Sequence, residues 1–306
     1  MKRPDFGGVK VMVAMENPIV RQGLQNVLGA AGFPRATEVG THDRMISNLV
    51  EARYDVILAS TELGSEPLSP FLIQLRQGAL VHHPMPIIIT FLSSSEQDDV
   101  RRAIDAGPDD LLQMPVVPGQ MLQRLAGFVE KRKTWVVTSD YVGPDRRQGI
   151  RPGAMVVPTI DVPNPMAMRI GKLPDDTIKD RLTVAGERLK AMRLARYAFE
   201  LQWLLRAIRG LFDQESTDKD KLISFCERIK TLLYGLPRLL PNGMTDDISA
   251  MVERLEMGTN ILIKSGLAAD QKILQGHSSL IIYLVRALQQ LLPADLGETV
   301  GLAPAS

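Results

Sequence analysis

Short apolar runs alternate with amphipathic stretches over the first 132 residues of the chain. The run Val-Lys-Val-Met-Val-Ala at residues 9–14 predicts a buried strand, and the apolar residues after it recur at helical spacing up to Gly32 and Pro34. More strands are expected at residues 36–39, 55–60, 86–91 and 111–112, each followed by an amphipathic segment. Because strands that alternate with helices indicate right-handed βαβ units, the pattern predicts an α/β fold with a doubly wound five-stranded parallel sheet.

This alternation stops between residues 133 and 174. The segment contains six prolines and four glycines, which favour an extended linker over packed secondary structure. Arg146 and Arg147 follow a Gly-Pro-Asp turn in a locally basic stretch. We therefore expect a solvated linker, or alternatively a docking strip in which these two arginines contact an anionic partner.

From Asp175 onward the spacing of the apolar residues becomes helical. Amphipathic stretches at residues 178–212, 221–234, 248–264 and 268–292 have short connections, which predicts an all-α helical bundle. The tail from Ala294 is rich in Ala, Gly and Pro and is expected to fray. The predicted parts are an α/β domain, a linker, a helical domain and a flexible tail, at residues 1–132, 133–174, 175–293 and 294–306.

The composition narrows the class of protein. The 36 basic residues nearly balance the 35 acidic ones, which disfavours a nucleic-acid module over the whole length. The single cysteine, Cys226, excludes an intrachain disulfide and a cysteine-based zinc site. No apolar run approaches the ~18 residues of a membrane span. We expect a cytoplasmic protein without a membrane span, a bound metal or a cofactor.

Three motifs of the first domain match a known family. They are Glu16-Asn-Pro-Ile-Val-Arg21 after the first strand, Ala103-Ile-Asp-Ala-Gly-Pro-Asp-Asp110 at the fourth helix, and Met114-Pro115 after the fifth strand. With this order of elements, residues 8–132 resemble the receiver domain of bacterial response regulators, which act in two-component signalling and phosphorelays. The resemblance implies a doubly wound fold with its site at the carboxyl ends of the strands.

The residues at that implied site depart from the receiver pattern. Receivers use two carboxylates for Mg²⁺, a phosphoacceptor aspartate, a Ser or Thr hydroxyl and a lysine before a proline. Serine at the phosphoacceptor position cannot form an acyl phosphate, and methionine in place of the lysine carries no charge. We therefore expect an unphosphorylatable pseudo-receiver with no catalytic residues. In its degenerate site the carboxylate pair corresponds to Met15 and Glu16, and the phosphoacceptor corresponds to Ser60. The hydroxyl position corresponds to Phe91 or Leu92, with Thr90 nearby but not aligned with it, and the lysine corresponds to Met114, directly before Pro115.

The segment Tyr141-Val-Gly-Pro-Asp-Arg-Arg147 is also similar to known sequences. It resembles a segment that follows receiver-like domains in some alphaproteobacterial proteins. Arg146 and Arg147 are expected to pair with acidic groups on the receiver-like domain or on a partner.

The predicted helix at residues 178–212 is strongly basic, with eight basic residues against three acidic ones. Such an excess is typical of the solvated face of a bundle helix, and alternatively of a surface for nucleic acid or an acidic protein. The candidate partner-binding residues on it are Arg188, Arg193 and Arg196. No helix-turn-helix pattern accompanies them.

Two further features of the helical domain suggest function. His277, in Gly-His-Ser-Ser, resembles the helical histidine of a phosphotransfer module, although the Lys-Gly pair expected after such a histidine is absent. The apolar arc of residues 268–292 is wider than one bundle face, so this helix is either central or forms a homodimer. The preferred function is non-catalytic signalling by protein–protein interaction. The alternatives are a transcriptional or RNA-binding regulator that uses the basic helix, and phosphotransfer through His277.

Overall fold

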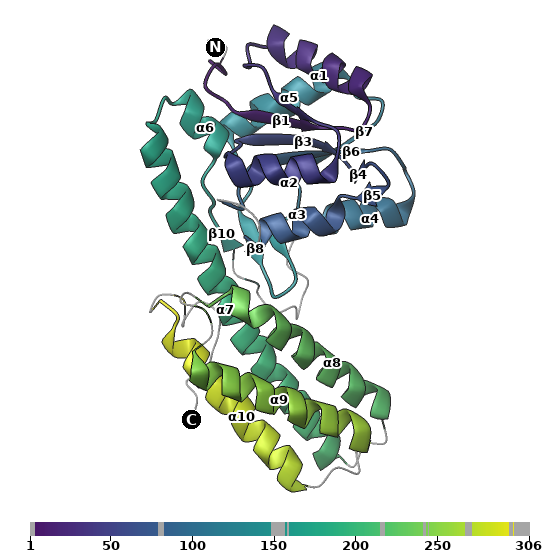
Figure 1. The fold of residues 1–306 in the computed structure, drawn as a ribbon, viewed down its shortest axis with the longest axis vertical. Coiled ribbons are helices and arrows are strands. Elements are labelled where there is room, and N and C mark those ends of the chain that lie inside the picture. The colour runs from purple at the N-terminus through teal and green to yellow at the C-terminus, as the bar shows by residue number, and fades with distance from the viewer. Residues whose placement is uncertain are drawn as a thin grey trace. The chain divides into compact units, whose positions relative to one another are not determined.

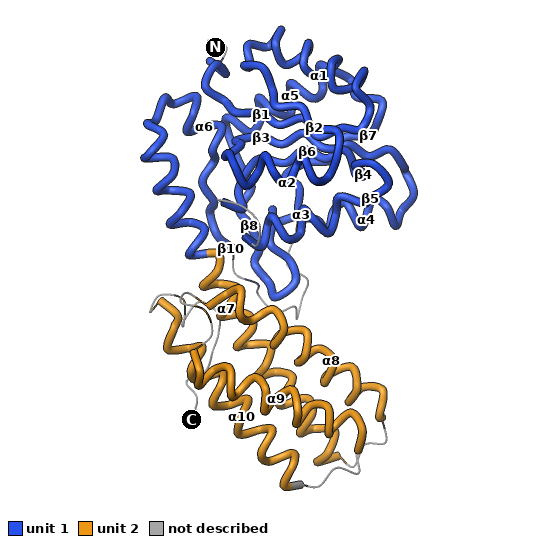
Figure 2. The backbone as a smooth tube through the Cα atoms, viewed as in Figure 1, with its two compact units in different colours: residues 1–188 blue, residues 189–306 orange. Residues whose placement is uncertain are grey.

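The chain forms two compact units, residues 1–188 and residues 189–306 (Figure 2). The computed structural model describes residues 4–78, 83–147, 157, 159–214, 218–240, 243, 245–266, 271–293 and 296. Both units contribute to one long helix, α7 (Asp175–Asp213), because the boundary between them lies inside it. No helix of the described residues is long and apolar enough to cross a membrane.

The centre of the first unit is a parallel sheet of five strands (Figure 1). Its strands are β1 (Val11–Ala14), β2 (Thr37–Val39), β3 (Val56–Ser60), β6 (Ile87–Leu92) and β7 (Asp110–Gln113). They lie in the order β2-β1-β3-β6-β7, and every neighbouring pair is parallel. This is the order of receiver and flavodoxin-like folds, and it confirms the predicted α/β fold with a doubly wound sheet.

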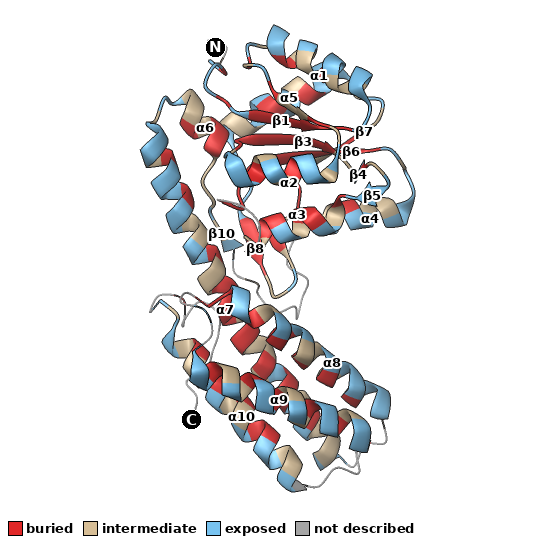
Figure 3. Ribbon diagram, in the orientation of Figure 1, coloured by how far each residue is buried: buried red, intermediate tan, exposed pale blue. Residues whose placement is uncertain are grey.

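Helices cover both faces of this sheet because successive strand residues point to opposite sides. One face packs against α1 (Pro18–Ala30) and α5 (Pro118–Glu130) through the odd-numbered residues of β1, Val11 and Val13. The other face packs against α2 (His42–Glu51) and α3 (Ser69–Arg76) and reaches the end of α4 (Gln97–Asp105). Figure 3 shows the strands buried between these two layers.

Local sequence sets where these helices begin. Pro18 occupies the first turn of α1, and the Asn17 side chain accepts a hydrogen bond from the Ile19 amide at 2.9 Å. The Thr41 hydroxyl caps α2 in the same way, by accepting from the Arg44 amide. These caps leave the turns after β1 and β2 at the carboxyl edge of the sheet.

The segment expected to be a linker is folded over its described residues, which corrects the prediction for residues 133–174. It forms a three-stranded antiparallel sheet from β8 (Trp135–Val137), β9 (Val142–Pro144) and β10 (Thr159–Ile160), followed by α6 (Pro165–Ile170). Two of its prolines belong to ordered elements, since Pro144 ends β9 and Pro165 begins α6. The segment belongs to the first unit because Trp135 and Met166 are completely buried.

A buried ion network joins this segment to the main sheet. Asp109, just before β7, accepts hydrogen bonds from Arg76 at 2.7 Å, from Arg132 at 2.9 Å and from the Ile88 amide at 2.9 Å. The two guanidiniums also flank the Trp135 ring, at 4.7 and 5.0 Å from its centroid. Burial alone would raise the pKa of Asp109, but the charges of Arg132 and Arg76 more than offset it and hold that pKa below its ordinary value.

The remaining donors of the two arginines bind main-chain carbonyls. Because five N–H groups of a guanidinium need acceptors when they are buried, these bonds let the charges leave water. The acceptors are the carbonyls of Gly107, Pro84 and Pro86 for Arg76, and of Met85, Pro163 and Pro86 for Arg132. The network therefore connects the starts of β6 and β7 to the chain that precedes α6.

The second unit is helical, as predicted. Its elements are the second part of α7, α8 (Lys219–Gly235), a 3₁₀ turn (Leu236–Arg238), α9 (Asp246–Ser265) and α10 (Gln271–Gln290). The bundle core is built from aliphatic residues of all four helices. The tail expected at 294–306 lies outside the described residues except for Leu296.

The apolar arc of the last helix is accommodated inside the bundle. Ile281, Leu284, Val285 and Leu288 of α10 are buried in the core. A second set of apolar residues beside them is partly buried against the same core: Ile273, Leu274, Leu280, Ile282 and Leu292. Most of the apolar arc of α10 thus packs inside its own bundle and does not require a second copy of the chain.

We predict that Asp109→Asn destabilises the first unit by about 3 kcal/mol or more, because it leaves two buried guanidiniums without their anion. Urea unfolding monitored by Trp135 fluorescence, in a Trp203→Phe background, measures this loss. The matched control is Asp110→Asn, which removes a more exposed carboxylate that lies 3.4 Å from Arg124. That variant should cost less than about 1 kcal/mol. Equal losses for the two variants would contradict a special role of Asp109.

Candidate functional site

The carboxyl edge of the parallel sheet collects the ends of four strands. The register pairs Ala14 of β1 with Ala59 of β3, Ser60 with Phe91 of β6, and Leu92 with Gln113 of β7. The residues that follow or end these strands therefore come to one edge, as the receiver resemblance implies. Each predicted position carries a different local structure there.

At the first position a methionine is buried, and the loop after β1 is fixed by hydrogen bonds. Met15 is 4% exposed and packs in the core, whereas Glu16 is exposed. The Arg21 guanidinium donates to the main-chain carbonyls of Met15 and Glu16, at 2.5 and 2.7 Å, and its Nε lies 3.5 Å from Glu38. Gly40 leaves room for that guanidinium, since a Cβ there would lie 2.9 Å from it. A cation of the protein thus lies beside the loop where a receiver holds Mg²⁺.

The second position lies at the start of a small hairpin. The Ser60 hydroxyl donates to the Glu62 carbonyl, and the chain then forms β4 (Glu62–Leu63) and β5 (Glu66–Pro67) around Gly64, which has a φ of +74°. Leu63 is buried and anchors the hairpin. The Ser60 hydroxyl is therefore engaged by the main chain of its own turn.

The positions on β6 offer no hydroxyl at the edge itself. Phe91 is completely buried and faces the layer of α1 and α5. Thr90 points to the opposite face, is buried as well, and its Oγ1 has no hydrogen-bond partner among the described residues. Serines also follow Leu92, and they are not among the predicted site residues. Of these, Ser93 is exposed, and Ser94 accepts from the Glu96 amide at 3.0 Å.

The last position places a thioether where receivers have an ammonium group. The Met114 amide donates to the Leu92 carbonyl at 2.8 Å, and the Met114 side chain is half-buried against the core. Pro115 follows across a cis peptide bond and is exposed. Of the positions carried over from the receiver pattern, Glu16 alone is a carboxylate. Within the part of the chain that the structure describes, no three His, Cys, Asp or Glu residues gather to hold a metal ion.

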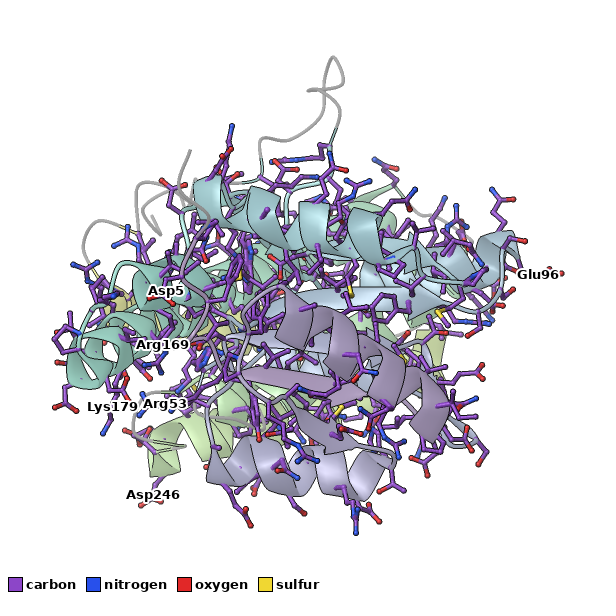
Figure 4. All side chains as sticks on the ribbon, turned by 90° about the horizontal axis from the view of Figure 1, so that it is seen from above. Asp5, Arg53, Glu96, Arg169, Lys179 and Asp246 are labelled. Atoms are coloured by element: carbon purple, nitrogen blue, oxygen red, sulfur yellow. The ribbon has the colours of Figure 1, made fainter. Side chains whose placement is uncertain are left out.

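The amino edge of the sheet carries the buried carboxylates instead. Asp55 is 2% exposed, accepts from the Lys10 amide at 2.8 Å and pairs with Arg169 of α6 at 3.1 Å. Burial raises the pKa of Asp55, and the Lys10 amide and Arg169 offset this in part. Arg169 also bonds Asp175 in the first turn of α7. Figure 4 shows Arg169 at the end of the sheet opposite Glu96, so Asp55 anchors α6 rather than the receiver-type site.

The segment that includes Arg146 and Arg147 folds back onto its own unit. Arg146 donates to the Pro108 carbonyl at 2.6 Å, and Arg147 binds Asp145 with two hydrogen bonds at 2.8 and 2.9 Å. The backbone of this segment comes so close to the loop before β7 that a Cβ on Gly143 would lie 3.0 Å from the Gly107 Cα. The first arginine thus pairs with a backbone carbonyl of the receiver-like part rather than with an acid.

The candidate arginines of α7 lie in three different environments. Arg188 is exposed, whereas Arg193 is buried and lies 5.8 Å from the Tyr197 ring. Arg196 is half-buried over the Phe199 ring at 5.0 Å. These side chains do not form one solvated basic row, which disfavours the alternative of a nucleic-acid surface along the helix.

His277 is buried inside the second unit, which argues against the alternative of phosphotransfer through this residue. It is 2% exposed, and its Nε2 lies 2.9 Å from the Thr259 hydroxyl. That hydroxyl donates to the Leu255 carbonyl at 2.7 Å, so the ring donates to Thr259 as the neutral Nε2–H tautomer. Gly258 makes room for the ring, since a Cβ there would lie 2.9 Å from it. A phosphotransfer histidine must reach a partner's aspartate, and this one does not reach the surface.

We predict that the buried His277 makes the second unit sensitive to acid. Burial lowers the pKa of His277 to about 4, whereas an unfolded chain protonates histidine near pH ~6.5. The contribution of neutral His277 to the free energy of unfolding is therefore fully present above about pH 6.5 and is lost as the pH falls towards 4. Between about pH 7 and about pH 5, the free energy of unfolding of the wild type should fall by about 2 kcal/mol more than that of the His277→Gln variant. Urea unfolding followed by far-ultraviolet circular dichroism measures the difference. If the free energies of unfolding of the two proteins change with pH in parallel, the prediction is wrong.

The solved structures similar to this chain include response regulators and receiver domains. No family model and no curated protein sequence matches the chain. The response regulator DrrB of Thermotoga maritima matches at 19% identity and a TM-score of 0.36, over 41% of this chain and 55% of that chain. The chemotaxis protein CheY4 of Vibrio cholerae matches at 18% identity and a TM-score of 0.35, over 39% of this chain and 97% of that chain.

An orphan response regulator of H. pylori matches at 14% identity and a TM-score of 0.35, over 40% of this chain and 96% of that chain. This chain therefore spans about half the length of DrrB and nearly all of the other two proteins. On its strand order β2-β1-β3-β6-β7, the first unit of the chain has the flavodoxin-like doubly wound fold, which receiver domains share.

Proposed function

We propose that this protein is a non-catalytic signalling protein whose receiver-like unit binds another protein without being phosphorylated. The observation that carries the proposal is the state of the carboxyl edge. The receiver fold is complete, yet the Ser60 hydroxyl is bound within a hairpin and the Arg21 guanidinium lies on the loop after β1. An edge of this kind keeps a receiver's shape for recognition and lacks its phosphoryl chemistry.

The chemistry missing from this edge is electrostatic. Phosphoryl transfer depends on positioned charges, with a metal ion and a lysine that neutralise the transferred group. Met15 withholds one metal ligand, and Met114 withholds the cation. Restoring a carboxylate at Ser60 alone leaves both deficits in place, so it does not restore the reaction.

We expect no acyl phosphate on the wild type, and almost none on Ser60→Asp, after incubation with acetyl phosphate and Mg²⁺. Intact mass and phosphate-affinity gels measure the product. Ser60→Asn is the matched control for the substitution, and an active receiver in the same assay shows that the phosphodonor works. Trace labelling of Ser60→Asp is compatible with the proposal. Stoichiometric labelling of the wild type would overturn it and would indicate that another carboxylate of this edge, such as Glu16 or Glu62, forms a working site.

A further inference from the structure

We propose that the second unit binds an acidic amphipathic helix of a partner protein on the outer face of α7. This outer face consists of Arg196, Phe199, Trp203, Arg206 and Gly210 of α7, with Phe225 of α8 beside it. The proposal extends the proposed function by naming a partner surface, and it does not depend on whether the first unit is phosphorylated.

The residues of the outer face form one stripe along the helix. Their positions, 196, 199, 203, 206 and 210, are separated alternately by three and four residues, which brings them onto one side of an α-helix. The core-facing residues of the same helix, such as Leu201 and Leu205, lie between them in the sequence and are buried. Spacing of this kind is the one that helices use to pack against another helix.

The centre of the stripe is an aromatic cluster that water still reaches. Trp203 is 47% exposed, and its ring packs edge-on against Phe225 at a centroid distance of 5.7 Å. Phe199, one turn earlier, is partly buried under the Arg196 guanidinium. Tryptophan and arginine dominate the binding energy of protein interfaces because they bury a large area and retain a polar group. A half-exposed tryptophan held by a neighbouring ring is suited to that role.

The charge of the stripe selects the partner's chemistry. Arg206 is exposed, and Arg196 Nε is buried without a hydrogen-bond partner among the described residues. Residues 196–210 contain one acid, Glu200, and it already pairs with Arg228 of α8 through hydrogen bonds of 2.5 and 2.9 Å. The outer face therefore presents the exposed Arg206 and the half-buried Arg196, which also interacts with Glu200, beside an apolar centre. A partner that supplies carboxylates around an apolar strip complements both features.

The same charges argue against a second copy of this chain as the occupant. A second copy would bring its own Arg196 and Arg206 to the contact, and its Glu200 is engaged by Arg228. A nucleic acid would need a row of exposed cations, but Arg193 is buried and Arg209 is turned towards Ser278 of α10, at 3.2 Å. The straight stripe spans about 21 Å at 1.5 Å per residue, which suits a helix of a few turns.

The test uses the full chain and a designed helical peptide of about three heptads, with Leu at the a and d positions and Glu at most others. Fluorescence anisotropy of the labelled peptide should show saturable binding that weakens with added salt. Trp203→Ala and Arg206→Glu should each weaken binding by about tenfold or more. The matched control, Tyr283→Ala, removes an exposed aromatic residue of α10 and should leave binding unchanged.

Several outcomes would overturn the proposal. Absence of binding would do so, as would equal binding of a peptide with Lys in place of Glu. Retention of full affinity in a Trp203→Ala protein whose circular dichroism is unchanged would also do so. Displacement of the peptide by a single-stranded oligonucleotide that needs the same residues would assign the face to nucleic acid. A dimer in light scattering that Trp203→Ala abolishes would assign it to a second copy. Because Ser60→Asp should bind the peptide normally, this result is separable from the phosphorylation test.

Discussion

The buried carboxylate of Asp109 sets the arrangement of the first unit. A charge that has left water is tolerated only when other groups neutralise it and bond to it, and here Arg76, Arg132 and the Ile88 amide do so. These partners come from the end of α3, from the residues after α5 and from the start of β6. Their positions relative to the sheet are consequently coupled, and the backbone carbonyls bound by the two guanidiniums extend that coupling to Pro163.

The same network explains why the chain after α5 stays with the receiver-like part. Trp135 is completely buried, and the guanidiniums that bind Asp109 also lie against its indole ring. The three-stranded sheet that begins at Trp135 is thereby attached to the amino edge of the parallel sheet. Asp55 and Arg169 form a second attachment at this edge, through α6. The amino edge thus carries buried ion pairs that join the segment after α5 to the parallel sheet.

The two edges of the parallel sheet therefore differ in kind. At the amino edge Asp109 and Asp55 are buried, and each is paired with arginine. At the carboxyl edge polar groups bind the main chain of their own loops, as Ser60 and Arg21 do. Among the positions carried over from the receiver pattern, this edge has one carboxylate, Glu16, and a methionine in place of the lysine, and the proposed absence of phosphorylation rests on this difference. The proposed function assigns this edge to recognition of another protein, for which the shape of the fold is sufficient.

The amino-acid sequence by itself determined the elements of the sheet and the residue types at its carboxyl edge. Periodicity of apolar residues is a local property, so strands such as residues 9–14 and the bundle helices followed from it. Residue identity is likewise direct, so Ser60 and Met114 predict the loss of phosphoryl chemistry without reference to coordinates. These statements depend on neighbours in the chain and on what each side chain is.

Only the tertiary structure decided which side chains meet and how deeply they are buried. The buried network joins residues that are far apart in the sequence, Arg76, Asp109 and Arg132, and no local sequence pattern predicts that they meet. The proline content predicted a linker at residues 133–174. That prediction was wrong because composition contains no information on the tertiary contacts that bury Trp135. Arg193, a candidate partner-binding residue, and His277, the residue of the phosphotransfer alternative, are both buried, which the local pattern did not predict. Burial and pairing depend on the distant residues that pack around a side chain, and periodicity along the chain does not contain them.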